Sequence, residues 1–123
     1  MTAVETTEGQ RLYECLLAVR PTQFPEGVHG GDGSYVPRTP WSGLSVRTQW
    51  SQEEWERIAA EFWRAPEPRD GKALYRCVLM VNPIQRREFS DYVMRRPAWD
   101  RLGERRQEQW HEIARRYAVG AGR

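Results

Sequence analysis

A stretch of ten residues that occurs twice constrains the fold of this chain more than any other feature of its sequence. Residues 12–21 read LYECLLAVRP and residues 74–83 read LYRCVLMVNP, so that Leu, Tyr, Cys, Leu, Val and Pro recur in register. A glycine, Gly9 or Gly71, stands three residues before each leucine. Such self-similarity indicates an internal repeat, in which both copies form the same structure.

Each copy of the stretch has the features of a β-strand, because it is rich in Leu, Val and Tyr and is bounded by Gly and Pro. Side chains alternate between the two faces of a strand. We expect Arg76 to pair with Glu14 across two adjacent strands, and the opposite face to pack on helices. That opposite face carries the same four residue types in both copies: Tyr13, Cys15, Leu17 and Val19, then Tyr75, Cys77, Leu79 and Val81.

The segment that begins at Ser51 predicts a helix. Ser51 and Glu54 are spaced as a capping box, and Trp50 and Trp55 are spaced as a hydrophobic staple. An apolar stripe at helical spacing then repeats in a second helix over about residues 104–118. Its members are Trp55, Ile58, Ala59 and Phe62, then Trp110, Ile113, Ala114 and Tyr117.

The approach to each helix repeats as well. The pattern Trp41-x-x-Leu44-x-x-Arg47-x-Gln49 aligns with Trp99-x-x-Leu102-x-x-Arg105-x-Gln107. Residues 86–96 look helical, with Phe89 and Val93 facing inward, and Pro97 ends that helix. Residues 44–48 suggest a short strand. Residues 22–50 are rich in Pro, Gly and Ser, and so long a connection in a compact domain is typically functional or mobile.

These patterns predict an α+β fold in a single domain over residues 1–123. Residues 9–64 form the first repeat, residues 71–118 form the second, and residues 65–70 link them. Each repeat is a β-loop-α unit, and a pseudo-twofold axis relates the two. The units form a small antiparallel sheet that helices pack on one face.

The formal net charge of +2 conceals an asymmetry between the two halves. Residues 1–62 carry five Arg against nine Asp and Glu, whereas residues 63–123 carry thirteen Arg and one Lys against eight Asp and Glu. A basic half suits an acidic partner. Pairs of arginines either follow a phosphate backbone or lie on solvated helix surface. The pairs concerned are Arg86, Arg87, Arg95, Arg96, Arg105, Arg106, Arg115 and Arg116.

The composition favours a cytoplasmic protein. No run approaches the roughly 20 apolar residues of a membrane span, and the polar, acidic N-terminus is unlike a signal peptide. The two cysteines occupy equivalent positions and are interpreted as reduced, buried residues. The excess of Arg over Lys, eighteen to one, is typical of a GC-rich bacterial or phage genome.

Several residues outside the core patterns are candidates for binding. Trp41 and Trp63 suggest an exposed aromatic patch, and His29, Asp32 and Tyr35 in the glycine-rich part of the loop suggest a ligand site. We expect no catalytic residue, metal or cofactor. The sequence has no CxxC motif, no Cys/His ligand cluster and no nucleotide-binding glycine motif.

The sequence therefore predicts a small non-catalytic binding module. Its first expected partner is a protein, contacted through residues 22–50 and the aromatic patch. The alternative is a nucleic acid bound by the Arg-rich second half. A third hypothesis is a small enzyme or ligand-binding protein that uses His29 and Asp32.

Overall fold

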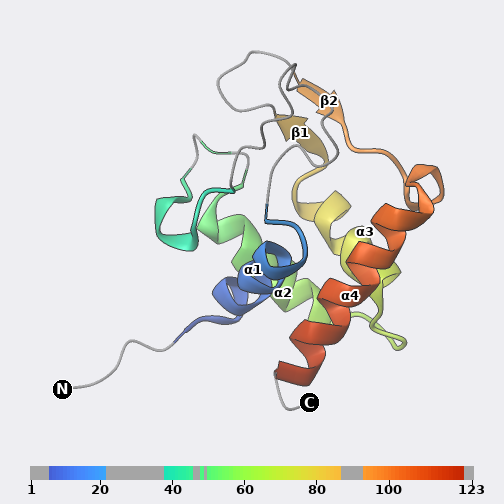
Figure 1. Ribbon diagram of the computed structural model, residues 1–123, viewed down its shortest axis with the longest axis horizontal. Helices are drawn as coiled ribbons and strands as arrows, with labels where there is room; N and C mark the ends of the chain where they lie inside the picture. The colour runs from blue at the N-terminus through green and yellow to red at the C-terminus, as the bar shows by residue number, and fades with distance from the viewer. Residues whose placement is uncertain (1–5, 22–37, 46–47, 49, 87–92, 121–123) are drawn as a thin grey trace.

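The computed structural model describes residues 6–21, 38–45, 48, 50–86 and 93–120, and this part of the chain is helical. Short 3₁₀ turns, η2 (Trp41–Gly43) and η3 (Trp99–Arg101), precede the second and fourth helices. A small antiparallel hairpin pairs β1 (Ile84–Arg86) with β2 (Val93–Arg95) (Figure 1). The four helices are α1 (Glu8–Val19), α2 (Gln52–Arg64), α3 (Gly71–Val81) and α4 (Glu104–Gly120).

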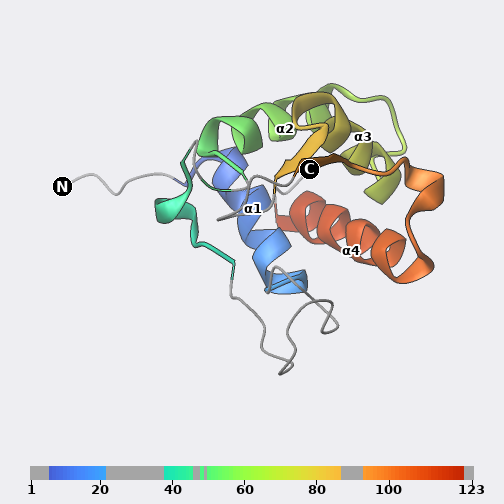
Figure 2. The ribbon, with the colours of Figure 1, turned by 90° about the horizontal axis from the view of Figure 1, so that it is seen from above.

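The four helices form a ring in which each helix packs on two others. Helix α1 packs on α2 and on α4, and α3 packs on α4 and on α2 (Figures 1 and 2). Each repeat is thus a helical hairpin, α1–α2 or α3–α4, and the two hairpins pack on each other. The buried residues of all four helices belong to one hydrophobic cluster, so the two repeats share one core.

The predicted α+β fold is wrong, because the repeated stretch forms helices α1 and α3 and not the strands of a sheet. Its buried residues follow helical spacing: Leu12, Tyr13 and Leu16 in α1, and Leu74, Tyr75, Cys77 and Val78 in α3. The side chains of Thr7 and Asp70 cap the two helices by accepting from the N–H of Gln10 and Ala73. Arg76 and Glu14 are exposed on these helices and do not pair; Glu14 accepts from Gln10 instead.

Gly9 and Gly71 lie where the two helices of each repeat approach each other closely. A Cβ at Gly71 would lie 2.3 Å from the backbone nitrogen of His111, and a Cβ at Gly9 would lie 2.6 Å from that of Glu56. The N–H of Gly9 donates to Oε1 of Glu56 at 2.7 Å, and the N–H of Gly71 donates to Nδ1 of His111 at 3.0 Å. These glycines therefore mark helix–helix contacts rather than strand ends.

The helices predicted to begin at Ser51 and to span about residues 104–118 are confirmed, and they are α2 and α4. The hydroxyl of Ser51 accepts from the N–H of Glu54 at 3.2 Å, and the Glu54 carboxylate accepts from the N–H of Ser51 at 2.8 Å. The rings of Trp50 and Trp55 lie 4.7 Å apart, as a hydrophobic staple requires. The residues of both predicted stripes are buried.

Two local predictions are wrong. Residues 86–96 do not form a helix, because Arg86 ends β1 and residues 93–95 form β2; residues 87–92 lie outside the described part. The residues described within 44–48 form no strand. The hydroxyl of Thr48 instead donates to the carbonyl of Ser45 and accepts from its N–H, which closes a turn.

The two repeats make the same contacts at equivalent positions. The hydroxyl of Tyr13 donates to the carbonyl of Thr39 at 2.5 Å, and the hydroxyl of Tyr75 donates to that of Pro97 at 2.5 Å. Each tyrosine ring also packs on two equivalent tryptophan rings. The centroid distances are 6.0 and 5.4 Å from Tyr13 to Trp41 and Trp55, and 5.9 and 5.5 Å from Tyr75 to Trp99 and Trp110.

Glutamine side chains complete the match between the repeats. The amides of Gln52 and Gln107 donate to the carbonyls of Trp41 and Trp99, each at 2.9 Å. Gln52 is therefore the structural equivalent of Gln107, and the sequence alignment that pairs Gln49 with Gln107 is shifted by the length of an insertion. In the second repeat the chain enters α4 earlier, which places Arg105 and Arg106 in its first turn.

Candidate functional site

Two equivalent arginines, Arg38 and Arg96, close the connection between the two helices of each repeat. The Nε–H of Arg38 donates to the carbonyl of Arg20, and the Nε–H of Arg96 donates to that of Asn82, each at 2.8 Å. Arg20 and Asn82 are the C-cap residues of α1 and α3. Both connections therefore begin and end at the same end of the helical ring, where the β1–β2 hairpin lies (Figure 1).

Arg20 and Arg106 join this pair. The side chain of Arg20 is half-buried, and the guanidinium groups of Arg38, Arg106 and Arg96 repel it. Burial and, after it, this repulsion lower the pKa of Arg20 to about 9. The side chain still carries its charge at neutral pH. We call Arg20, Arg38, Arg96 and Arg106 the arginine cluster.

Arg96 spans the interface between the repeats. Its guanidinium carbon lies 4.2 Å from the ring centroid of Trp50, a buried residue of the first repeat. A cation held over an indole face is attracted by the negative face of the ring. Burial lowers the pKa of Arg96 to about 10, and repulsion from Arg38 acts in the same direction. Tyr75 and Glu54 oppose that shift.

Two buried nitrogens of the cluster have no hydrogen-bond partner: Nε of Arg20 and Nη2 of Arg96. Glu54 is the carboxylate whose charge acts on Arg96, but both of its oxygens are engaged. Oε1 accepts from the N–H of Ser51 at 2.8 Å, and Oε2 accepts from Nδ2 of Asn82 at 2.7 Å. An unpaired buried donor costs free energy, so these two nitrogens lower the stability of the folded protein.

The cluster departs from the symmetry of the repeats in one respect. In the second repeat the C-cap residue Asn82 donates to Glu54 of the first. Arg20 of the first repeat occupies the position equivalent to Asn82, and Gln109 of the second repeat occupies the position equivalent to Glu54. Nε of Arg20 and Oε1 of Gln109 are both buried without a hydrogen-bond partner. Arg20 thus places a cation at the end of α1, where the equivalent residue at the end of α3, Asn82, places a hydrogen-bonded amide.

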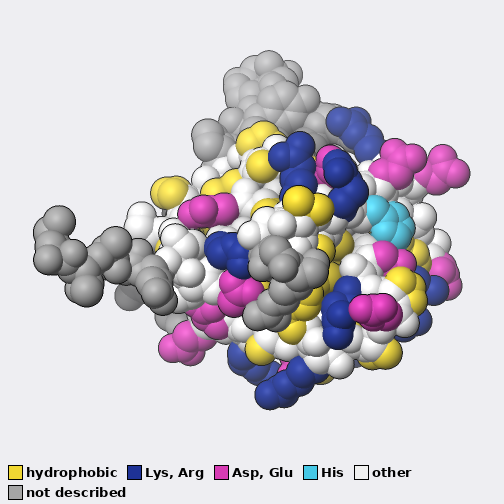
Figure 3. Space-filling model, turned by 90° about the horizontal axis from the view of Figure 1, so that it is seen from below, with side chains coloured by type: hydrophobic (Ala, Val, Ile, Leu, Met, Phe, Trp, Pro, Cys, Tyr) yellow, Lys and Arg dark blue, Asp and Glu magenta, His cyan; other side chains and the backbone are white. Residues whose placement is uncertain are grey.

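The other arginines proposed from the sequence do not join the cluster. Arg95 and Arg105 are exposed, and Arg115 and Arg116 are exposed on α4, where both pair with Glu112. The side chain of Arg86 and all of Arg87 lie outside the described part. Other exposed arginines pair with nearby glutamates, such as Arg64 with Glu61 at 3.2 Å. Figure 3 shows basic and acidic side chains interspersed over the face seen from below.

The proposed aromatic patch is not brought together. Trp41 lies in η2, where its carbonyl accepts from Gln52 at the start of α2, whereas Trp63 lies at the end of that helix. Both rings are half-buried: Trp41 packs on Tyr13, and Nε1 of Trp63 donates to the hydroxyl of Tyr117 at 2.7 Å. The proposed ligand-loop residues His29, Asp32 and Tyr35 lie outside the described residues.

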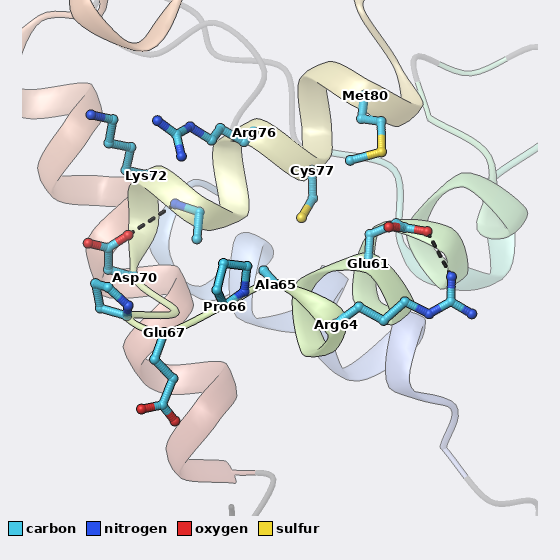
Figure 4. A pocket seen from close by; sticks show the side chains of 12 residues that line it. Glu61, Arg64, Ala65, Pro66, Glu67, Asp70, Lys72, Arg76, Cys77 and Met80 are labelled. Atoms are coloured by element: carbon cyan, nitrogen blue, oxygen red, sulfur yellow. Dashed lines mark hydrogen bonds and ion pairs between the residues drawn. The ribbon is translucent and has the colours of Figure 1, made fainter.

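A hollow of about 460 Å³ opens at the opposite end of the molecule, between the end of α2, residues 65–70 and α3 (Figure 4). Its lining mixes both charges, with Glu61 and Asp70 beside Lys72 and Arg76. The thiol of Cys77 points into it (Figure 4). Burial, with a smaller contribution from Glu61, raises the pKa of Cys77 to about 11. The thiol is therefore protonated at neutral pH and is a poor nucleophile.

Sequence reasoning missed Arg20 and Arg38, half of the cluster. The available signal was a second shared pattern, Arg38-x-x-Trp41 against Arg96-x-x-Trp99, which places an arginine at the same distance before each 3₁₀ turn. Arg20 gave no such signal, because Asn82 stands at the equivalent position. Its role depends on the packing of α1 against α4, which is a contact between distant segments.

Comparisons with protein-family models, with curated proteins and with solved structures find no match for this chain. In the described part, no helix combines the length and the apolar character that crossing a membrane requires. The described residues also contain no group of three or more His, Cys, Asp or Glu side chains able to hold a metal ion.

Proposed function

We propose that the protein is a small non-catalytic module that binds an acidic segment of a partner protein with the arginine cluster. One observation carries this proposal: four guanidinium groups from both repeats gather at one end of the fold, and two of their buried nitrogens have no partner. A protein holds repelling charges together at a cost to its stability, and a bound anion offsets that cost. The arrangement therefore favours binding over a purely structural role.

A protein partner is favoured over a nucleic acid by the shape of the basic surface. Arginines that follow a nucleic-acid backbone are spread along a face, since the phosphate charges are regularly spaced. Here the cluster is compact, while Arg115, Arg116 and Arg64 are paired with glutamates of their own helices. Compact groups of arginines are typical of the recognition of single acidic groups.

Binding without catalysis is supported by the state of the reactive side chains. Burial raises the pKa of both Cys15 and Cys77, which opposes formation of a thiolate. Nδ1 of His111 accepts from the N–H of Gly71 and so holds two helices together. We also propose a cytoplasmic location, which the two free cysteines support.

The test is recovery of a partner protein from nuclease-treated lysate of the source cells, with the immobilised protein as bait. The variant Arg20→Asn with Arg106→Gln removes two charges from the cluster. The matched control, Arg115→Gln with Arg116→Gln, removes two charges from exposed positions of α4. We expect the wild type and the control to retain the same partner, and the cluster variant to lose it while its circular dichroism spectrum remains native.

Two results contradict the proposal. Equal loss in the control variant would show that general basic charge is responsible, not the cluster. Recovery that depends on intact nucleic acid, with affinity that falls steeply with salt, would support the nucleic-acid alternative.

A further inference from the structure

We infer that the hollow between the end of α2, residues 65–70 and α3 is a binding site for a small carboxylate with an aliphatic body, such as a short-chain fatty acid. This site lies away from the arginine cluster, so the inference does not rest on the proposed function. The volume of the hollow, about 460 Å³, is typical of pockets that hold small molecules. Its lining combines unpaired cations with apolar side chains (Figure 4).

Two cations on one face of α3 border the hollow. Lys72 and Arg76 are four residues apart in the helix, which places their side chains next to each other, and both line the hollow (Figure 4). Both are exposed. Among the residues that the structure describes, neither side chain forms a hydrogen bond or an ion pair. Their charge is therefore available to an anion that enters the hollow.

The acidic side chains of the lining are engaged within the protein. Glu61 pairs with Arg64 at 3.2 Å. Glu67 pairs with Arg69 at 3.3 Å. Asp70 is the N-cap residue of α3, and its carboxylate accepts from the backbone of that helix. The unpaired charges of the described lining are thus both positive, and they favour an anion over a cation.

The rest of the lining is apolar. Ala65, Pro66 and Pro68 come from the segment after α2, and Cys77 and Met80 come from α3. The thiol of Cys77 points into the hollow, and Met80 lies beside it (Figure 4). Met80 is 60% exposed, although it is a large apolar side chain. An aliphatic body that covers Met80 removes this surface from water, which favours binding.

The order of these residues along α3 orients the ligand. Lys72 begins the part of the helix that borders the hollow, Arg76 lies midway and Met80 ends it. Arg76 and Met80 are about 6 Å apart along the helix axis, from the rise of 1.5 Å per residue. The carboxylate then lies beside Lys72 and Arg76, and the aliphatic body extends towards Met80. Glu61 lies towards Met80 and away from Lys72 (Figure 4), where it repels a carboxylate in the opposite orientation.

The test is titration with hexanoate, hexanamide and acetate at constant ionic strength and neutral pH, followed in ¹H–¹³C methyl spectra. We expect hexanoate to shift the methyl signals of Met80, Ala65 and Ala73, which line the hollow. Ala60, an exposed residue of α2 outside the lining, should keep its signal in place. Hexanamide should bind about fivefold more weakly because it lacks the charge. Acetate should bind at least about tenfold more weakly because it lacks the aliphatic body.

Variants locate the carboxylate. Lys72→Gln and Arg76→Gln should each weaken hexanoate binding about threefold to fivefold, as expected for the loss of one exposed cation. The matched control Arg57→Gln removes a charge at an exposed position of α2 outside the lining, and it should leave the affinity unchanged. The cluster variant Arg20→Asn with Arg106→Gln should also leave it unchanged, which separates this site from the proposed function.

Four outcomes would overturn the inference. Equal affinities for hexanoate and hexanamide would show that no anion is recognised, and equal affinities for hexanoate and acetate would show that the apolar lining takes no part. Shifts that never saturate, or that are as large at Ala60 as at Met80, would show that hexanoate does not bind in the hollow. Loss of hexanoate binding in the cluster variant would place the carboxylate at the arginine cluster instead.

Discussion

Arg20 and Asn82 occupy the same place in the two repeats, yet they make different interactions. Their backbones are nearly identical, with φ and ψ of −133° and 75° at Arg20 and of −139° and 73° at Asn82. Asn82 forms a hydrogen bond with Glu54 of the other repeat, whereas Nε of Arg20 and Oε1 of Gln109 have no partner. One position in the fold thus holds a hydrogen-bonded amide in one repeat and a buried donor without a partner in the other.

This contrast predicts that Arg20→Asn stabilises the unliganded protein by about 1 kcal/mol, or roughly 3–5 °C in Tm. The substitution removes a repelled charge and brings an amide to the position whose equivalent partner is Gln109, as Glu54 is the partner of Asn82. Because the pKa of Arg20 is lowered to about 9, the wild-type native state carries the unfavourable charge below that pH. The gain should therefore be complete at pH 6–8 and shrink above about pH 9, where the native wild type releases the proton. Thermal unfolding over this range measures it, and a lower Tm for the variant at pH 7 would contradict the prediction.

At the scale of elements, the helices α2 and α4 could be predicted from the sequence and α1 and α3 could not. The capping box of Ser51 and the spaced stripe after Trp55 are local signals, and local signals are present in the sequence itself. The stretch 12–19 carries apolar residues on most of its surface, because α1 packs on two helices. A continuous apolar stretch of this kind is compatible with both a buried strand and a buried helix, so its periodicity does not distinguish the two. Gly9 and Gly71 then appeared as strand boundaries, although they serve helix contacts.

The role of these glycines is testable by substitution. Gly71→Ala and Gly9→Ala should each lower the free energy of unfolding by about 1–3 kcal/mol, because the added methyl group would overlap the backbone of the facing helix. Gly103→Ala is the matched control, since a Cβ there meets no atom within 4 Å. It should change stability by no more than about 0.5 kcal/mol. Urea denaturation compares the three variants, and a cost at Gly103 as large as that at Gly71 would refute the helix-contact explanation.

At the scale of the whole molecule, the charge asymmetry of the sequence has a different meaning in the structure. The halves differ in net charge, but the arginine cluster takes Arg20 and Arg38 from the acidic half and Arg96 and Arg106 from the basic half. The sequence therefore indicated that arginines matter without indicating which ones. The selection depends on the packing of two hairpins on each other, which no single segment of the sequence contains.

The central claim is that this cluster, and not the basic surface in general, is the binding site. The most direct measurement is the arginine side-chain ¹H–¹⁵N correlation spectrum, recorded as a short glutamate-rich peptide is added at constant ionic strength. The Nε–H signals of Arg20, Arg38, Arg96 and Arg106 should shift together and saturate, while those of the exposed residues Arg57, Arg101, Arg115 and Arg116 stay in place. Shifts spread evenly over all arginines, or confined to the exposed ones, would contradict the claim.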